Sequence, residues 1–211
     1  MILLPLCYAA PIAYYHYLIH HHDCQIEVYG TYRKQTYANR CYIATANGIE
    51  TLTIPVEKGE GKTLVKDIRI ASHTDWQTMH YRAIESAYSS SAFFEYFADE
   101  FLPLYSARYK FLIDFNLDLQ QKILQCLNYQ DINLSLSTHY TKDVGEGNID
   151  LRQEFSAKSH FKLLPDIVNT PYYQVFSYKY GFKPNLSILD LLFNTAHEAR
   201  IYLREQTKRE G

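Results

Sequence analysis

Three cations lie close together in one polar segment of the sequence, residues 32–40. They are Arg33, Lys34 and Arg40. An arginine guanidinium can donate two parallel hydrogen bonds and a lysine ammonium supplies a compact charge, so both suit phosphate and carboxylate groups. A nucleotide-sugar or a coenzyme A thioester would present such groups. The alternative interpretation is an ordinary solvated basic loop, because charge alone does not separate the two.

Arg40 stands where this polar segment meets a largely apolar run, residues 41–46. We therefore expect its side chain to be partly buried. A partly buried guanidinium needs a partner, because an unpaired buried charge is costly. One hypothesis is that Arg40 binds an anionic ligand, and the alternative is an internal ion pair with Glu27 or Asp190.

His80 is the histidine that we select as a candidate general base. It follows Trp76 by four residues in a segment with helical periodicity, so the two side chains share one helix face. Histidine exchanges protons near neutral pH, which a general base requires. The alternative is a core histidine that forms one hydrogen bond.

Polar side chains also gather at the last predicted helix. Ser187 has the residue type of a helix cap, and Asp190 then falls in the first turn, where a carboxylate meets the positive end of the helix. Asn185 and Asn194 are better candidates for a binding pocket, because an amide side chain both donates and accepts hydrogen bonds.

The histidine-rich segment, residues 16–22, is not expected to bind a metal. His16 and His20 lie one helical turn apart, but a zinc site needs three or four converging ligands and one turn supplies two. The four cysteines form no CxxC pair, which indicates free thiols of an intracellular protein. The sequence also lacks a glycine-rich phosphate loop and a GxSxG motif.

These residues are expected to be positioned by a single α/β domain, residues 1–211, with a frayed end at 206–211. The chain begins with a strand–helix–strand pattern, which predicts a mainly parallel sheet. Asn47-Gly48 joins two strand-like runs and predicts a β-hairpin, because both residues tolerate positive φ. The expected strands are 2–6, 24–29, 40–46, 49–56, 66–71 and 132–136. The expected helices are 11–22, 72–88 with a Ser72/Asp75 cap, 92–102, 117–128 and one that begins after Ser187, and polar loops are expected at 30–39, 57–62 and 138–148.

Composition excludes some classes of partner. The net charge is −2, whereas a protein that binds nucleic acid non-specifically normally carries a basic excess. No run approaches the roughly 20 apolar residues of a membrane span, and the N-terminus lacks the basic start of a signal peptide. These features predict a cytoplasmic protein. The 20 tyrosines suit amphipathic pocket walls, including ones that stack on sugars, or a tyrosine-rich core.

Three sequence blocks, in order along almost the whole chain, carry a resemblance to a known family. The first is 8–15 (YAAPIAYY), the second is 32–41 (YRKQTYANRC) continuing through Asn47-Gly48 to 52–56 (LTIPV), and the third is 172–176 (YYQVF) followed by 181–182 and 184–194 (PNLSILDLLFN). Together they resemble the WbqC-like protein family. The resemblance implies an α/β domain found in bacterial clusters for O-antigen and related polysaccharides. It also implies a transferase that moves an acyl or aminoacyl group onto an activated amino sugar.

The same resemblance selects the candidate site. Its small-molecule substrate would be a nucleotide-sugar or an acyl-CoA, and the sequence indicates no particular cofactor or oligomeric state. A non-catalytic binding module or a scaffold of the biosynthetic complex remains the alternative. Tyr8, Lys34, Arg40, Gln174 and Asn185 are expected to line one concave pocket, with His80 as the base. The full set of candidate binding residues is Tyr8, Tyr32, Lys34, Gln35, Asn39, Arg40, Gln174, Asn185, Asp190 and Asn194.

Two features depart from the family pattern. Family members often follow the last asparagine of the third block with glycine, whereas Asn194 is followed by Thr195. The variable middle segment, 138–170, is short. If that segment completes a substrate site, this chain would have a narrowed or lost activity.

Overall fold

The chain begins in a parallel sheet. The computed structural model describes residues 1–58, 62–155 and 169–205. Four strands lie in the order β5-β2-β1-β6, and β1 pairs in parallel with both β2 and β6, while β2 pairs in parallel with β5. Their bounds are β1 (Ile2–Pro5), β2 (Asp23–Glu27), β5 (Asn133–Leu136) and β6 (Ile149–Asp150). The expected α/β fold with a mainly parallel sheet is confirmed.

Helix α1 (Ile12–His20) connects β1 to β2, as the opening pattern of the sequence predicts. Pro11 precedes its first residue with φ −66°, a value that suits a helix start. The first amides of α1 are already bonded, because Ile12 N donates to the Leu186 carbonyl at 3.1 Å and Ala13 N donates to Asn185 Oδ1 at 2.9 Å. The segment before α6 (Ile188–Thr195) therefore supplies the hydrogen-bond acceptors for the N-terminus of α1.

The predicted hairpin is present as β3 (Arg40–Thr45) and β4 (Gly48–Thr53), a separate antiparallel pair. Its turn differs by one residue from the expectation. Thr45 pairs with Gly48, so the connecting residues are Ala46 and Asn47. Only Gly48 of this turn has a positive φ, 107°, which glycine adopts without steric cost. Gly48 therefore begins the second strand and does not complete the turn.

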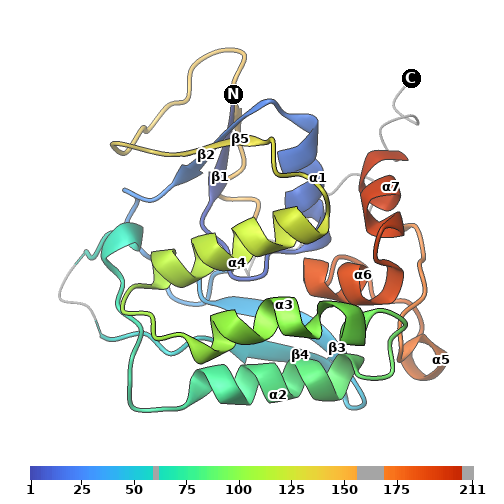
Figure 1. The fold of residues 1–211 in the computed structure, drawn as a ribbon. Coiled ribbons are helices and arrows are strands. Elements are labelled where there is room, and N and C mark those ends of the chain that lie inside the picture. The colour runs from blue at the N-terminus through green and yellow to red at the C-terminus, as the bar shows by residue number, and fades with distance from the viewer. Residues whose placement is uncertain (59–61, 156–168, 206–211) are drawn as a thin grey trace.

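Helices surround these sheets, and α4 (Leu112–Cys126) lies between the parallel sheet and the pair α2 (Trp76–Tyr88) and α3 (Phe94–Ser106) (Figure 1). Helix α7 stands beside α1, and the two helices are in contact. The interior is aromatic and aliphatic, with Tyr8, Tyr88, Phe115 and Phe193 fully buried. The helices are η1 (Val65–Asp67), α2 (Trp76–Tyr88), α3 (Phe94–Ser106), α4 (Leu112–Cys126), α5 (Ser177–Tyr180), α6 (Ile188–Thr195) and α7 (Glu198–Glu205).

Two expectations for the middle of the chain are wrong. Residues 66–71 are not a strand, because η1 occupies their start and only isolated bridges follow, Val56 with Ile70 and Arg69 with Phe111. Their hydrogen bonds go to irregular chain on either side, so no ladder extends. Helix α2 begins at Trp76 and not at Ser72, and Asp75 provides no side-chain cap.

The other expected elements are present with shifted ends. The sequence did not predict β6, η1, α5 or α7. Ser187 caps α6 as predicted, since its Oγ accepts a hydrogen bond from Leu189 N. The frayed end at 206–211, the centre of the loop 57–62 and most of the segment 150–170 lie outside the described residues. No helix among those described is both long and apolar enough to cross a membrane.

Candidate functional site

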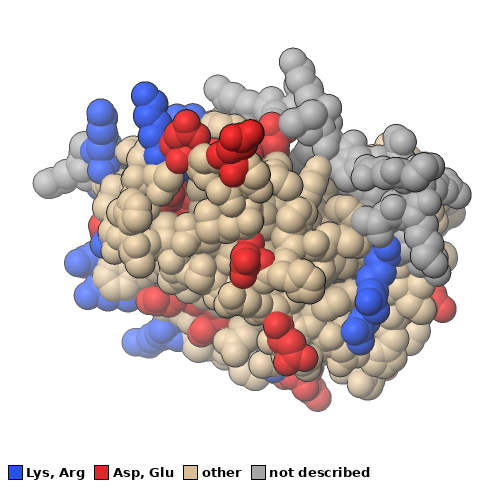
Figure 2. Space-filling view, turned by 90° about the horizontal axis from the view of Figure 1, so that it is seen from above, with Lys and Arg blue, Asp and Glu red and all other residues tan. Residues whose placement is uncertain are grey.

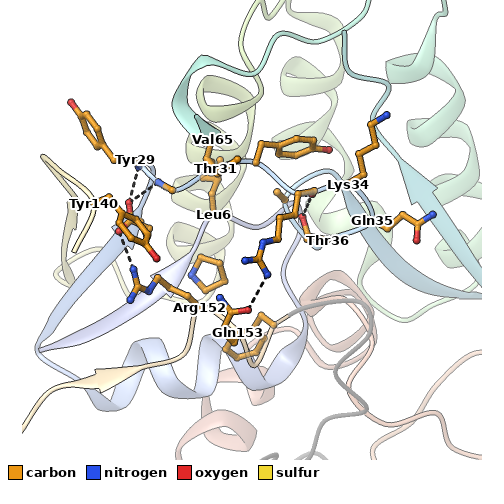
Figure 3. Close-up of a pocket in the computed structure, with 17 residues that line it drawn as sticks. Leu6, Tyr29, Thr31, Lys34, Gln35, Thr36, Val65, Tyr140, Arg152 and Gln153 are labelled. Atoms are coloured by element: carbon orange, nitrogen blue, oxygen red, sulfur yellow. Dashed lines mark hydrogen bonds and ion pairs between the residues drawn. The ribbon is translucent and has the colours of Figure 1, made fainter. Parts of the chain in front are cut away.

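A cavity of about 630 Å³ opens at the carboxyl ends of the parallel strands (Figure 3). Volumes of about 300–1,000 Å³ are usual for pockets that bind small molecules. Its walls come from residues that follow β1, β2 and β6, and from the polar segment 30–38. The lining residues are Pro5, Leu6, Glu27, Tyr29, Gly30, Thr31, Tyr32, Arg33, Lys34, Gln35, Thr36, Ala38, Val65, Tyr140, Arg152, Gln153 and Phe155.

The order of the strands explains why the cavity forms here. Strand β1 has β2 on one side, reached directly through α1, and β6 on the other, reached only after the helical part of the chain. The loops that leave β1 and its neighbours therefore diverge. In open α/β sheets, ligands bind in the crevice that such a reversal of strand order leaves at the carboxyl edge.

Glu27 is a buried carboxylate in the wall of this cavity, at the end of β2, and is 5% exposed. Its Oε1 accepts three hydrogen bonds, from Tyr29 N at 2.7 Å, Gly30 N at 3.1 Å and Ser137 Oγ at 2.9 Å. Glu27 therefore fixes the start of the polar segment and joins β2 to the chain after β5.

Arg152 lies beside Glu27 in the cavity wall, two residues after β6. It forms an ion pair with Asp150 at 2.6 Å and a longer one with Glu27 Oε2 at 3.4 Å, and it donates to the Thr141 carbonyl at 2.7 Å. Its guanidinium also lies over the Tyr140 ring, 5.2 Å from the centroid. Hydrogen bonding to Arg152 holds the pKa of Asp150 below its ordinary value. Because its donors are engaged, Arg152 organises the wall and is not a free anion-binding group.

The cations available to a ligand are Arg33 and Lys34. Neither forms an ion pair with any residue that the structure describes, and both side chains are exposed. Arg33 Nη1 reaches Gln153 Oε1 at 3.5 Å, a long contact that spans the cavity. Lys34 and Gln35 lie at the end of the cavity opposite Tyr140 and Tyr29 (Figure 3).

The segment that carries these cations is anchored at both ends. Val65 N donates to the Gly30 carbonyl at 2.9 Å, and Tyr8 N donates to the Tyr37 carbonyl at 2.7 Å. Gln35 adopts a positive φ of 60° at the centre of the segment. On the face drawn in Figure 2, Lys and Arg side chains are interspersed with Asp and Glu.

The predicted site residues divide into two groups. Tyr32, Lys34 and Gln35 line the cavity. The expectation that five residues share one pocket is wrong, because only Lys34 of that set lines it. The other candidates, Tyr8, Asn39, Arg40, Gln174, Asn185, Asp190, Asn194 and His80, lie in the interior or behind the cavity wall.

Tyr8 and His80 belong to a buried network. The Tyr8 hydroxyl lies 3.0 Å from His80 Nδ1 and 3.0 Å from the Tyr105 hydroxyl. His80 packs against Trp76 with ring centroids 5.2 Å apart, so the expected shared helix face is confirmed. Burial lowers the pKa of His80 to about 4, partly opposed by a hydrogen bond to the Thr53 carbonyl. This histidine is neutral at pH 7 and lies outside the cavity wall, which is the arrangement of a core histidine.

Asp190 and Gln174 form a second buried network, between α6 and the segment 172–183. The Asp190 carboxylate accepts hydrogen bonds from Tyr88, Tyr172 and Gln174. Gln174 also exchanges hydrogen bonds with the Lys183 backbone at 2.8 and 2.9 Å. Burial raises the pKa of Asp190 to about 6, and the three donors only partly oppose this shift. The network ties the third sequence block together.

The remaining amides have structural partners. Asn39 Nδ2 donates to the Ile54 carbonyl, Asn194 Nδ2 donates to the Asp190 carbonyl, and Asn185 accepts from α1. Arg40 is half-buried and forms no ion pair with a described residue, so the expected alternative partners Glu27 and Asp190 do not engage it. Its charge favours ionisation of Tyr32, a cavity residue, although burial dominates and raises the pKa of that phenol.

In the histidine-rich segment, ring nitrogens form hydrogen bonds with backbone carbonyls. His16 Nδ1 bonds to the Leu203 carbonyl at 3.3 Å and His20 Nδ1 to the His16 carbonyl at 2.8 Å. In the described part of the chain, no three His, Cys, Asp or Glu side chains are grouped as a metal would require.

Sequence reasoning missed Glu27, Arg152 and Tyr140 as cavity residues. For Glu27 a signal existed, because a carboxylate directly after the second strand of a strand–helix–strand unit falls at the ligand-binding edge of the sheet. Arg152 and Tyr140 carried no such signal. Tyr140 follows β5, which pairs with β2, and Arg152 follows β6, which pairs with β1. Only these pairings between distant segments bring the two side chains to the cavity.

Comparison with known proteins identifies a family for this chain. The sequence model of the WbqC-like protein family matches residues 8–165, about three-quarters of the chain. The "Uncharacterized protein Rv1507c" of Mycobacterium tuberculosis (strain ATCC 25618 / H37Rv) is 27% identical over 197 residues, which cover 82% of this chain and 84% of that protein. No solved structure matches the chain. The matched range includes every residue that lines the cavity except Pro5 and Leu6.

Proposed function

The chain belongs to the WbqC-like protein family, and we propose that it is a cytoplasmic transferase of bacterial surface-polysaccharide assembly. Its cavity would bind a substrate that carries phosphate groups, either an acyl-CoA donor or the nucleotide-activated amino sugar that accepts the group. The sugar amine would attack the acyl or aminoacyl carbonyl, so that an amide bond forms and the bond to the donor breaks. With an acyl-CoA donor, coenzyme A leaves as the thiol and takes up the proton that the amine loses.

One observation carries this proposal, the combination of a 630 Å³ cavity at the carboxyl edge of a parallel sheet with two unpaired cations at its rim. Lys34 and Arg33 are free to bind phosphate, whereas Arg152 is held by its own partners. The charge-assisted hydrogen bonds that such cations form with anions are stronger than neutral ones. The same segment lies within the family match.

A second candidate is a non-catalytic module that binds the same substrate and presents it to another enzyme. The composition of the cavity favours it. Among the described lining residues Glu27 is the one carboxylate, and three donors already occupy its Oε1. His80, the base suggested by the sequence, is buried elsewhere with a pKa of about 4.

A ligand screen with a matched pair of variants tests the shared premise. Nucleotide-sugars and acyl-CoAs are added to the wild-type chain, and the melting temperature is recorded. A ligand at 100 times its Kd should raise the stability by about 2.7 kcal/mol. Lys34→Ala should weaken binding about tenfold, consistent with the loss of one charged contact. Arg82→Ala on α2 removes the same charge from an exposed position outside the cavity and should leave binding unchanged.

Equal effects of the two variants, or no stabilisation by any phosphate-bearing compound, would refute the proposed site. To separate the two candidates, the chain with its bound substrate is incubated with the other substrate, an amino sugar or an acyl-CoA, and the products are examined by mass spectrometry. A product heavier than the acceptor by the mass of the acyl group supports the transferase. Tight binding without any product supports the module.

A further inference from the structure

One oxygen of the Glu27 carboxylate, Oε2, accepts fewer hydrogen bonds than the other. We propose that Glu27 Oε2 accepts a hydrogen bond from a ribose hydroxyl of the ligand, so that the cavity takes a ribonucleoside diphosphate group. This inference rests on the proposed function, because it names which part of an activated substrate the site recognises.

The two oxygens of Glu27 have unequal surroundings. Oε1 accepts three hydrogen bonds of 2.7–3.1 Å. Among the described residues, Oε2 is reached only by Arg152 Nη1 at 3.4 Å. Hydrogen bonds between ionised groups are ordinarily about 2.7–2.9 Å long, and a carboxylate has about four acceptor sites. Oε2 therefore retains acceptor capacity in the wall of a cavity, where a donor from a ligand would satisfy it.

The position of Glu27 in the fold matches this role. It is the last residue of β2, in a β1–α1–β2 unit at the carboxyl edge of a parallel sheet. In doubly wound folds that bind nucleotides, an acidic residue after the second strand hydrogen-bonds the ribose hydroxyls. Glu27 is 5% exposed and rigidly held, so its free lone pairs have a defined direction.

The phosphates cannot bind where those folds usually hold them. There the pyrophosphate meets the amides at the start of the first helix. Here the amides of Ile12 and Ala13 are bonded to Leu186 and Asn185, and the preceding turn contains no glycine. The phosphates must therefore bind to other hydrogen-bond donors, and Arg33 and Lys34 supply them.

These two requirements fit one extended ligand. Glu27 lies beside the Tyr29 and Tyr140 end of the cavity, because it bonds the Tyr29 amide and contacts the arginine that stacks on Tyr140. Lys34 lies at the opposite end (Figure 3). A ribose held at Glu27 would place its base near the tyrosines, whose rings can stack on it, and its diphosphate toward Lys34.

The test compares ligands on the unaltered full-length chain by isothermal titration calorimetry. UDP and ADP are each measured against their 2′,3′-dideoxy analogues and against inorganic pyrophosphate. We expect at least one ribonucleotide to bind about 10- to 100-fold more tightly than its dideoxy analogue, the range for a hydrogen bond to a charged group. This comparison requires no variant that might fail to fold.

Variants then assign the effect to the residue. Glu27→Gln should remove most of the difference between each ribonucleotide and its dideoxy analogue, while pyrophosphate binding stays the same. Glu50→Gln, an exposed carboxylate on β4, is the matched control and should change neither. Lys34→Ala should weaken all of these ligands, pyrophosphate included.

The outcomes are separable. Equal affinity for the ribonucleotides and their dideoxy analogues, with pyrophosphate bound through Lys34, would overturn the role of Glu27 and leave the anion site intact. Failure of pyrophosphate and both nucleotides to bind would overturn this inference together with the proposed function.

Discussion

The buried histidine His80 makes a quantitative prediction about stability and pH. Its ordinary pKa is 6.5, and burial lowers the pKa to about 4 in the folded chain. One pKa unit corresponds to about 1.4 kcal/mol, so the shift of about 2.5 units is worth about 3 kcal/mol. The side chain is only 6% exposed, and solvent screening of this interaction is therefore small.

The direction follows from where the proton binds. Between pH 6.5 and pH 4 the unfolded chain protonates His80 and the folded chain does not, so protons favour unfolding. The contribution of His80 is therefore fully present above about pH 6.5 and is lost progressively as the pH falls toward 4. His80→Gln removes the titrating group but keeps an amide that can bond Tyr8 and the Thr53 carbonyl.

The assay is urea unfolding of the wild-type chain and His80→Gln at pH 7 and pH 4. We expect the wild type to lose about 3 kcal/mol of unfolding free energy relative to His80→Gln when the pH falls from 7 to 4. Taking the difference cancels other groups that titrate in both proteins. A difference that does not change with pH, or an NMR titration of the His80 ring centred near pH 6.5, would refute the burial argument.

Three further predictions concern stability. Asp190 has a folded pKa of about 6 instead of 3.8, so the wild type should lose about 2 kcal/mol relative to Asp190→Asn as the pH rises from 4 to 7. Urea unfolding at both pH values measures this difference, and a constant difference would contradict the prediction. Gly48→Ala should destabilise the chain by more than about 1 kcal/mol in thermal unfolding, because φ is 107°; an unchanged melting temperature would argue against that turn. Ser187→Ala should lower the unfolding free energy in urea by about 1–3 kcal/mol, because it leaves Leu189 N and the Ala9 carbonyl without their buried partner. A loss below about 0.5 kcal/mol would show that another group replaces the Ser187 hydroxyl as the helix cap.

Local sequence patterns determined the elements but not their partners. The strand–helix–strand start, the hairpin at Gly48 and the cap at Ser187 each depend on residues adjacent in sequence, and all three are present. The register of the hairpin turn was off by one, because several turn types accommodate Asn-Gly and the pairing of the strands selects among them.

The candidate site shows the same division. The sequence alone identified Lys34 and Tyr32, because a polar basic segment between two strands is visible without knowing the fold. Only the tertiary structure decided that Glu27, Arg152 and Tyr140 share a cavity with them, because strand β6 pairs beside β1 only after more than a hundred residues have intervened. It also decided that Asp190 and His80 are interior groups. Residue type indicates that a side chain can donate, accept or titrate, but burial sets its pKa, and burial depends on contacts between segments that are distant in the sequence.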